Sequence, residues 1–119
     1  MPKTLTILLK SGTMMNMDSI VATKLAHAAR SKGYDVCIFL YGEGVTAIKE
    51  GQEPKRFPNT EKYLKELAKK DVKIAVCETC LAARGIKRGE EIKCGKIGSM
   101  TNDLVNFVGK SDRLISLGR

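Results

Sequence analysis

Three short apolar runs, rich in β-branched and aromatic residues, constrain the fold of this chain most. They cover residues 4–9, 36–41 and 73–76, and each is followed by a polar loop or an amphipathic segment. Nearly continuous apolar runs of this length are typical of parallel strands that are buried on both faces of a sheet. The runs therefore predict the centre of a parallel sheet.

Amphipathic segments occupy the intervals between these strands. A helix is predicted over residues 17–31, where Gly33 follows as a terminator, and another begins at Asn59 and Thr60. The other expected elements are short: a helix over residues 46–50, a helix that ends at Gly85, a strand over residues 93–98, a helix that begins at Ser99 and a strand over residues 113–117.

Strands that alternate with helices indicate a three-layer α/β/α fold of flavodoxin-like or Rossmann-like architecture, with a mostly parallel sheet of about five strands. The chain has 119 residues, enough for one hydrophobic core, and no linker or internal repeat divides it. We therefore expect a single domain over residues 1–119. The polar, proline-bearing residues 51–58 form the longest irregular stretch and are expected to be a mobile loop.

The composition is that of a globular protein, with 43% hydrophobic and 29% charged residues. The apolar runs are too short to span a bilayer, and the N-terminal residues lack signal-peptide architecture, so we expect a cytoplasmic protein with no membrane partner. The formal net charge of +8 suits an anionic partner. However, the lysines are dispersed and aromatic residues make up only 5% of the chain, which disfavours nucleic-acid binding.

Functional sites of open parallel sheets form at the carboxyl ends of the strands. Four loops qualify, and only the loop over residues 77–80 contains a strong nucleophile. Cys77 ends a strand and precedes a helix, where free backbone N–H groups favour a thiolate. Arg84 adds positive potential, whereas the neighbouring carboxylate of Glu78 opposes it.

Cys77 and Cys80 form a C-x-x-C pair, which leaves open a redox pair, half of a zinc site or two inert thiols. A zinc site would need Cys37 and Cys94, but Cys37 lies in a buried run and His27 has no partner at ligand spacing, so we expect no metal. The glycines near residue 42 are too few for a dinucleotide fingerprint, and we expect no cofactor. The residues assigned to the pocket around the cysteines are Met14, Met15, Gly44, Arg84 and Ser99.

The sequence resembles the DsrE/DsrF-like family, and in particular its TusD-like sulfur-relay members, over nearly its whole length. The opening strand, Phe39 to Val45, and the final stretch from Ser111 to Leu117 contribute to the resemblance. The most specific part is Val76-Cys77 followed by Leu81 to Ile86, because the sulfur-accepting cysteine of such proteins precedes Arg-Gly by the spacing of Cys77 rather than Cys80.

The resemblance implies that Cys77 accepts sulfane sulfur as a persulfide and passes it to a partner's thiol, with Cys80 as a resolving or accessory residue. It also implies a homo-oligomer, a trimer or hexamer, or a hetero-oligomer with related subunits, which would meet sulfur-donor and sulfur-acceptor proteins. Two alternatives remain open. One is a non-catalytic oligomer that binds a small ligand or nucleic acid, and the other is a thiol–disulfide redox protein that uses Cys77 and Cys80.

Overall fold

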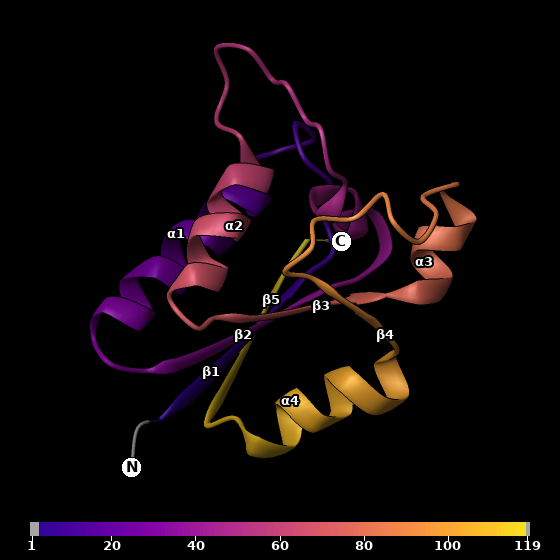
Figure 1. Cartoon of the computed structure of the whole chain (residues 1–119). Helices are drawn as coiled ribbons and strands as arrows, with labels where there is room; N and C mark the ends of the chain where they lie inside the picture. The colour runs from indigo at the N-terminus through magenta and orange to yellow at the C-terminus, as the bar shows by residue number, and fades with distance from the viewer. Residues whose placement is uncertain (1–2, 119) are drawn as a thin grey trace.

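The computed structural model describes residues 3–118, and its centre is a parallel five-stranded sheet (Figure 1). The strand order is β4-β3-β2-β1-β5, and every neighbouring pair is parallel. The strands are β1 (Thr4–Leu9), β2 (Asp35–Leu40), β3 (Lys73–Cys77), β4 (Lys96–Gly98) and β5 (Arg113–Leu117). The predicted α/β fold with a sheet of five strands is confirmed.

Helices cover both faces of the sheet (Figure 1). The chain steps from β1 through β2 to β3 in one direction, whereas β5 returns to the opposite side of β1. Because parallel crossovers are right-handed, α1 (Asp18–Ser31) and α2 (Thr60–Lys69) lie on one face and α4 (Val105–Lys110) lies on the other. The face with α1 and α2 thus has the two longer helices, of 14 and 10 residues, whereas α4 on the other face has 6 residues.

The core lies between the sheet and the two longer helices. Ile7 of β1 aligns with Ile38 of β2, which aligns with Ile74 of β3, and all three side chains are buried. On the opposite face, the Thr6 hydroxyl donates to the carbonyl oxygen of Phe107 at 3.3 Å, so α4 is tied to β1 by a polar contact. Successive side chains of a strand point to opposite faces of the sheet. Because helices cover both faces, the three runs are continuously apolar in the sequence.

Two predicted boundaries are wrong. The helix expected over residues 46–50 is the 3₁₀ helix η1 (Gly42–Ile48), which begins directly after β2. Gly42 has φ +59° and makes this abrupt turn possible. The strand expected over residues 93–98 is reduced to β4, because Lys93, Cys94 and Gly95 form a turn that packs on Ile48.

The final helix begins with an irregular turn. A π-helical segment, η2 (Met100–Leu104), precedes α4 and is capped by Ser99, whose hydroxyl accepts the N–H of Asn102 at 3.1 Å. The short helix α3 (Glu78–Ala83) follows β3 directly, as predicted. Among residues 3–118, no helix is both long and apolar enough to cross a membrane.

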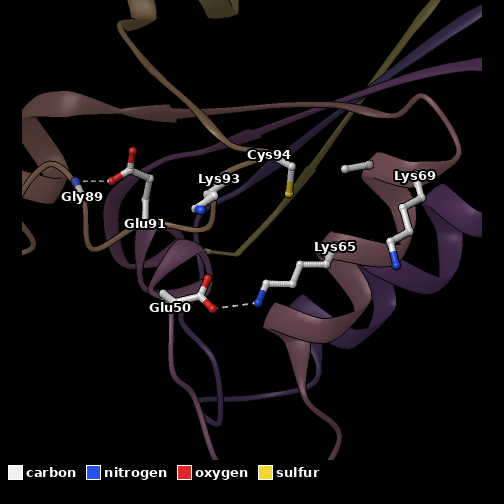
Figure 2. Close-up of a pocket in the computed structure, with 8 residues that line it drawn as sticks. Glu50, Lys65, Lys69, Gly89, Glu91, Lys93 and Cys94 are labelled. Atoms are coloured by element: carbon white, nitrogen blue, oxygen red, sulfur yellow. Dashed lines mark hydrogen bonds and ion pairs between the residues drawn. The ribbon is translucent and has the colours of Figure 1, made fainter.

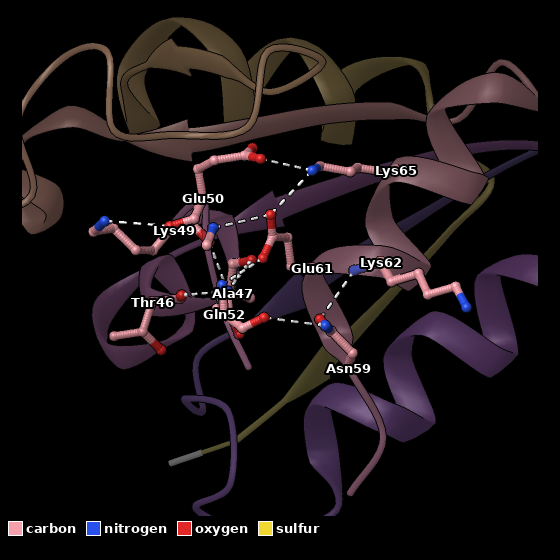
Figure 3. Close-up of polar contacts among 10 residues, drawn as sticks. Thr46, Ala47, Lys49, Glu50, Gln52, Asn59, Glu61, Lys62 and Lys65 are labelled. Carbon is pink, nitrogen blue, oxygen red and sulfur yellow. Dashed lines mark hydrogen bonds and ion pairs between the residues drawn. The ribbon is translucent and has the colours of Figure 1, made fainter. Parts of the chain in front are cut away.

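The irregular segment over residues 51–58 is anchored where it leaves η1 (Figure 3). The side-chain amide of Gln52 donates to three carbonyl oxygens at the end of η1, those of Thr46, Ala47 and Lys49, at 2.9–3.2 Å. The buried carboxylate of Glu61, at the start of α2, accepts the N–H groups of Gly51 and Gln52. These bonds hold the first residues of the segment, and the expected mobility of its tip stays a prediction.

Candidate functional site

Cys77 occupies the junction between a buried strand and a helix. It is the last residue of β3, lies beside Gly98 of β4 and stands immediately before α3 with an extended backbone (φ −70°, ψ 118°). The residue is only 6% exposed. The sequence therefore predicted its place in the fold, but the thiol lies under the surface rather than open to solvent.

Cys80 lies one helical turn further along, and its sulfur faces the start of η1. The N–H of Gly42 donates to Cys80 Sγ at 3.3 Å. Burial raises the pKa of the Cys80 thiol above its ordinary value, and the neighbouring Cys77 thiol raises it further. The Cys80 thiol is thus less acidic than an ordinary cysteine thiol, and it lies where α3 meets η1.

Arg84 fastens α3 to η1. Its Nε and Nη2 atoms donate to Glu43 Oε1 at 2.9 and 2.6 Å, and its Nη1 atom donates to the carbonyl oxygen of Cys80 at 3.0 Å. The bonds to Glu43 also raise the pKa of Arg84. The Arg84–Glu43 pair, which we call the strap, therefore spans the two elements that flank the thiols, and the carboxylate offsets much of the positive charge expected from Arg84.

The carboxylate of Glu78 is directed to a different partner. Glu78 Oε2 accepts a hydrogen bond from Arg88 Nη2 at 2.8 Å, in an exposed ion pair. This pairing reduces the repulsion that a free carboxylate beside Cys77 would exert on a thiolate.

The other predicted pocket residues lie in the same set of loops, and their place around the thiols stays a prediction. Gly44 packs on the end of β1, where a β-carbon would collide with the carbonyl oxygen of Leu9. Ser99 caps η2 and is next in sequence to Gly98, the neighbour of Cys77. Met14 and Met15 are 61% and 65% exposed in the loop after β1.

Sequence reasoning missed Gly42 and Glu43 as parts of the site. Gly42 turns the chain with a positive φ, and Gly44 allows the close approach to β1. The signal for Glu43 was weak, because its partner is 41 residues away along the chain. The available clue was that Glu43 and Arg84 both follow predicted strands, whose carboxyl ends meet at one edge of the sheet.

The remaining two cysteines lie outside the site. Cys37 is buried in β2, and burial raises the pKa of its thiol. Cys94 is exposed in the turn before β4. In the described part of the chain, no three His, Cys, Asp or Glu side chains are arranged to hold a metal ion. The four thiols therefore do not converge as a zinc site would require.

Comparisons with known proteins agree with this architecture. The model of the DsrE/DsrF-like family matches residues 3–117. The uncharacterized protein MJ0989 of Methanocaldococcus jannaschii is 35% identical over 95 residues, covering 80% of this chain and 82% of that protein. Protein YchN of Escherichia coli K12 is 26% identical over 113 residues, covering 92% of this chain and 96% of YchN.

Solved structures share the same fold. The crystal structure of the E. coli YchN protein matches with a TM-score of 0.89 at 25% identity, covering 98% of this chain and 100% of that one. A protein of unknown function, MTH1491 from Methanobacterium thermoautotrophicum, matches with a TM-score of 0.80 at 12% identity, which is a likeness of fold alone. Because the family model spans nearly the whole chain, this protein belongs to the DsrE/DsrF-like family.

Proposed function

We propose that this protein is a sulfur carrier that accepts sulfane sulfur on Cys77 as a persulfide and passes it to a partner's thiol. The DsrE/DsrF-like family is known in general for sulfur relay. The observation that supports the proposal most is the place of Cys77 at the carboxyl end of β3, directly before α3, which contains the second cysteine, Cys80. Two cysteines at this edge of a parallel sheet suit sulfur chemistry better than a structural role.

The transfer is two thiol exchanges without net oxidation. The Cys77 thiolate attacks the outer sulfur of a donor persulfide, the new sulfur–sulfur bond forms on Cys77, and the donor leaves as a thiolate that takes up a proton. An acceptor thiolate then attacks the outer sulfur on Cys77 and restores the Cys77 thiol. Because Cys77 is 6% exposed, α3 or the strap has to move before a partner's sulfur can make this approach.

Cys80 supports a second candidate, a thiol–disulfide redox role. Attack of the Cys80 thiolate on the inner sulfur of a Cys77 persulfide would form a Cys77–Cys80 disulfide and release sulfide. The spacing of the two cysteines, one helical turn apart, favours this route, whereas the raised pKa of Cys80 slows it. We therefore assign Cys80 an accessory role, in which it discharges the persulfide when no acceptor is present.

We further propose that the protein assembles with copies of itself, or with related subunits, through the face of the sheet that α4 covers. Val105 and Val108 of α4 are 62% and 38% exposed, and Leu114, which β5 presents on the same face as Thr6, is 47% exposed. Exposed apolar side chains gathered on one face mark interaction surfaces. Sedimentation of the wild type and of Val105→Glu tests this, and a wild-type monomer at micromolar concentration would refute it.

A persulfidation experiment tests the role of Cys77. The protein, with its cysteines in the free thiol form, is incubated with a cysteine desulfurase and cysteine, or with rhodanese and thiosulfate. Cleavage after glutamate places each cysteine in a separate peptide, with Cys77 in residues 67–78, Cys80 in residues 79–90 and Cys94 in residues 92–119. Mass spectrometry of these peptides then assigns each adduct.

The expected adduct is one sulfur atom, about 32 Da, on the peptide over residues 67–78, and dithiothreitol should remove it. Cys77→Ser should abolish it, whereas Cys94→Ser should leave it unchanged, and Cys80→Ser should lengthen its lifetime. A Cys77 peptide that stays unmodified with both donors would rule out the carrier role. A non-catalytic binding protein would be favoured by two results together. The thiols would be alkylated at ordinary rates, and the oligomer would accept no sulfur from either donor.

A further inference from the structure

A second candidate site lies away from the thiol pair, between α2 and the turn that precedes β4 (Figure 2). It is a cavity of about 580 Å³ whose charged and polar lining comes from Glu50, Lys65, Lys69, Glu91, Lys93 and Cys94. The turn enters β4 at Lys96, which aligns with Ala75, so the cavity lies toward the amino end of β3 and away from Cys77. It is therefore separate from the proposed sulfur site.

Of the three lysines that line this cavity, only one is in an ion pair among the described residues. Glu50 is paired with Lys65 at 2.8 Å, and Lys65 also contacts Glu61 at 3.0 Å. Glu91 Oε1 accepts the N–H of Gly89 at 2.6 Å, which orients this carboxylate but leaves its charge, so the lining has three lysines against two glutamates. Lys69 and Lys93, by contrast, make no ion pair within residues 3–118, which leaves two ammonium groups at one cavity free to bind an anion.

The positive field continues beyond the cavity. A neighbouring cavity of about 450 Å³ shares Cys94 and is lined by three further lysines, Lys73, Lys96 and Lys110, of which Lys96 is paired with Asp103 at 2.7 Å. Such a cluster raises the local concentration of anions. Cavities of roughly 300–1,000 Å³ are the size of small-molecule sites, whereas a polyanion would need a more extended groove.

We propose that the cavity between α2 and the β4 turn binds a small organic anion. Lys69 and Lys93 pair with its carboxylate or phosphate groups, and the alkyl stems of the lysines together with Ala68 contact its carbon skeleton. This role goes beyond the sulfur chemistry of Cys77 and does not depend on it. Carboxylate and phosphate are distinguished by the ligands used in the test.

Cys94 serves as a reporter within the cavity, because its sulfur is directed into the space beside Lys65 (Figure 2). The protein is alkylated with iodoacetate, which is anionic, or with iodoacetamide, which is neutral, and the rate at Cys94 is read from the peptide over residues 92–119. The ratio of the two rates is compared with the ratio in urea-unfolded protein. The same thiolate attacks the iodine-bearing carbon of both reagents and displaces iodide, so the ratio reports the field of the cavity rather than the acidity of the thiol.

The iodoacetate-to-iodoacetamide rate ratio in the folded protein should exceed that in the unfolded protein by about threefold or more at low ionic strength. This excess should disappear at high salt, so that the folded and unfolded proteins give the same ratio. Lys69→Gln and Lys93→Gln should each lower it. Lys62→Gln is the matched control, since it removes the same charge from α2 but lies outside the cavity lining. Succinate or inorganic phosphate at millimolar concentration should slow alkylation of Cys94 in the wild type and not in Lys69→Gln.

Four outcomes would overturn the proposal. The first is a rate ratio equal to that of the unfolded protein, and the second is an equal loss in Lys62→Gln and Lys69→Gln, which would indicate net charge alone. The third is an absence of protection by both succinate and phosphate. Protection by a short oligonucleotide at far lower concentration than by phosphate would also refute a small-molecule site and indicate a polyanion surface instead.

Discussion

The substitution Glu61→Gln isolates the polar network that joins α2 to the end of η1 (Figure 3). The Glu61 side chain is 7% exposed and accepts the N–H of Gln52 at 2.7 Å and that of Gly51 at 3.1 Å. Glutamine keeps one carbonyl oxygen for these two donors, and its amide group faces the other. One of these partly buried N–H groups loses its acceptor, and the remaining bond is no longer charge-assisted.

The expected loss follows from these bonds. A hydrogen bond to a charged group contributes about 1.5–3 kcal/mol, and one such bond is lost while the other is weakened, so we expect a loss of about 2–3 kcal/mol. The ion pair with Lys65 adds little, because Lys65 is 42% exposed. For a chain of 119 residues, this corresponds to a fall in Tm of about 8–12 °C.

The same network predicts a pH dependence. Burial alone would raise the pKa of Glu61, but the N–H of Gln52, the Lys65 ammonium and the N–H of Gly51 together hold it below the ordinary value of 4.5. A carboxyl group with a lowered folded-state pKa stabilises the fold above its ordinary pKa, and that stability is lost as pH falls through the lower value. The difference between wild type and Glu61→Gln should therefore be constant near neutral pH and shrink below pH 4.5.

Urea unfolding at a fixed protein concentration measures both effects, since any assembly would make Tm depend on concentration. Glu66→Gln is the matched control, because it changes the same residue type on an exposed position of α2. Equal stability of Glu61→Gln and Glu66→Gln would show that the network does not hold the segment after η1, and a difference that is unchanged at pH 3–4 would refute the pH reasoning.

Two further comparisons use matched pairs. Gly44→Ala should destabilise the protein by about 2–4 kcal/mol, because its β-carbon meets backbone at the end of β1, whereas Gly109→Ala in α4 should stabilise it by about 0.5–1 kcal/mol. Urea unfolding measures both, and a destabilised Gly109→Ala with an unaffected Gly44→Ala would contradict the packing described. Arg84→Gln breaks the strap and should speed alkylation of Cys80 severalfold, while Arg88→Gln, which breaks an exposed pair, should not. Equal rates in both variants would show that the strap does not cover the thiols.

The order of elements and the position of Cys77 could be predicted because both depend on local patterns. Buried parallel strands produce continuous apolar runs, and the period changes where a helix begins, so β3 and α3 were predicted on either side of Cys77. The extent of η1 and β4 was not predicted, since short 3₁₀ helices and edge strands depend on packing more than on periodicity.

The sequence by itself determined a parallel α/β sheet, a family, and a cysteine at the end of its third strand. Only the tertiary structure decided that this cysteine is buried, that Cys80 accepts the N–H of Gly42, and that Arg84 is bound by Glu43. The physical reason is that strand and helix formation follow from the spacing of neighbouring residues. The partners of a polar side chain, by contrast, come from elements about 40 residues apart that the fold brings to one edge of the sheet.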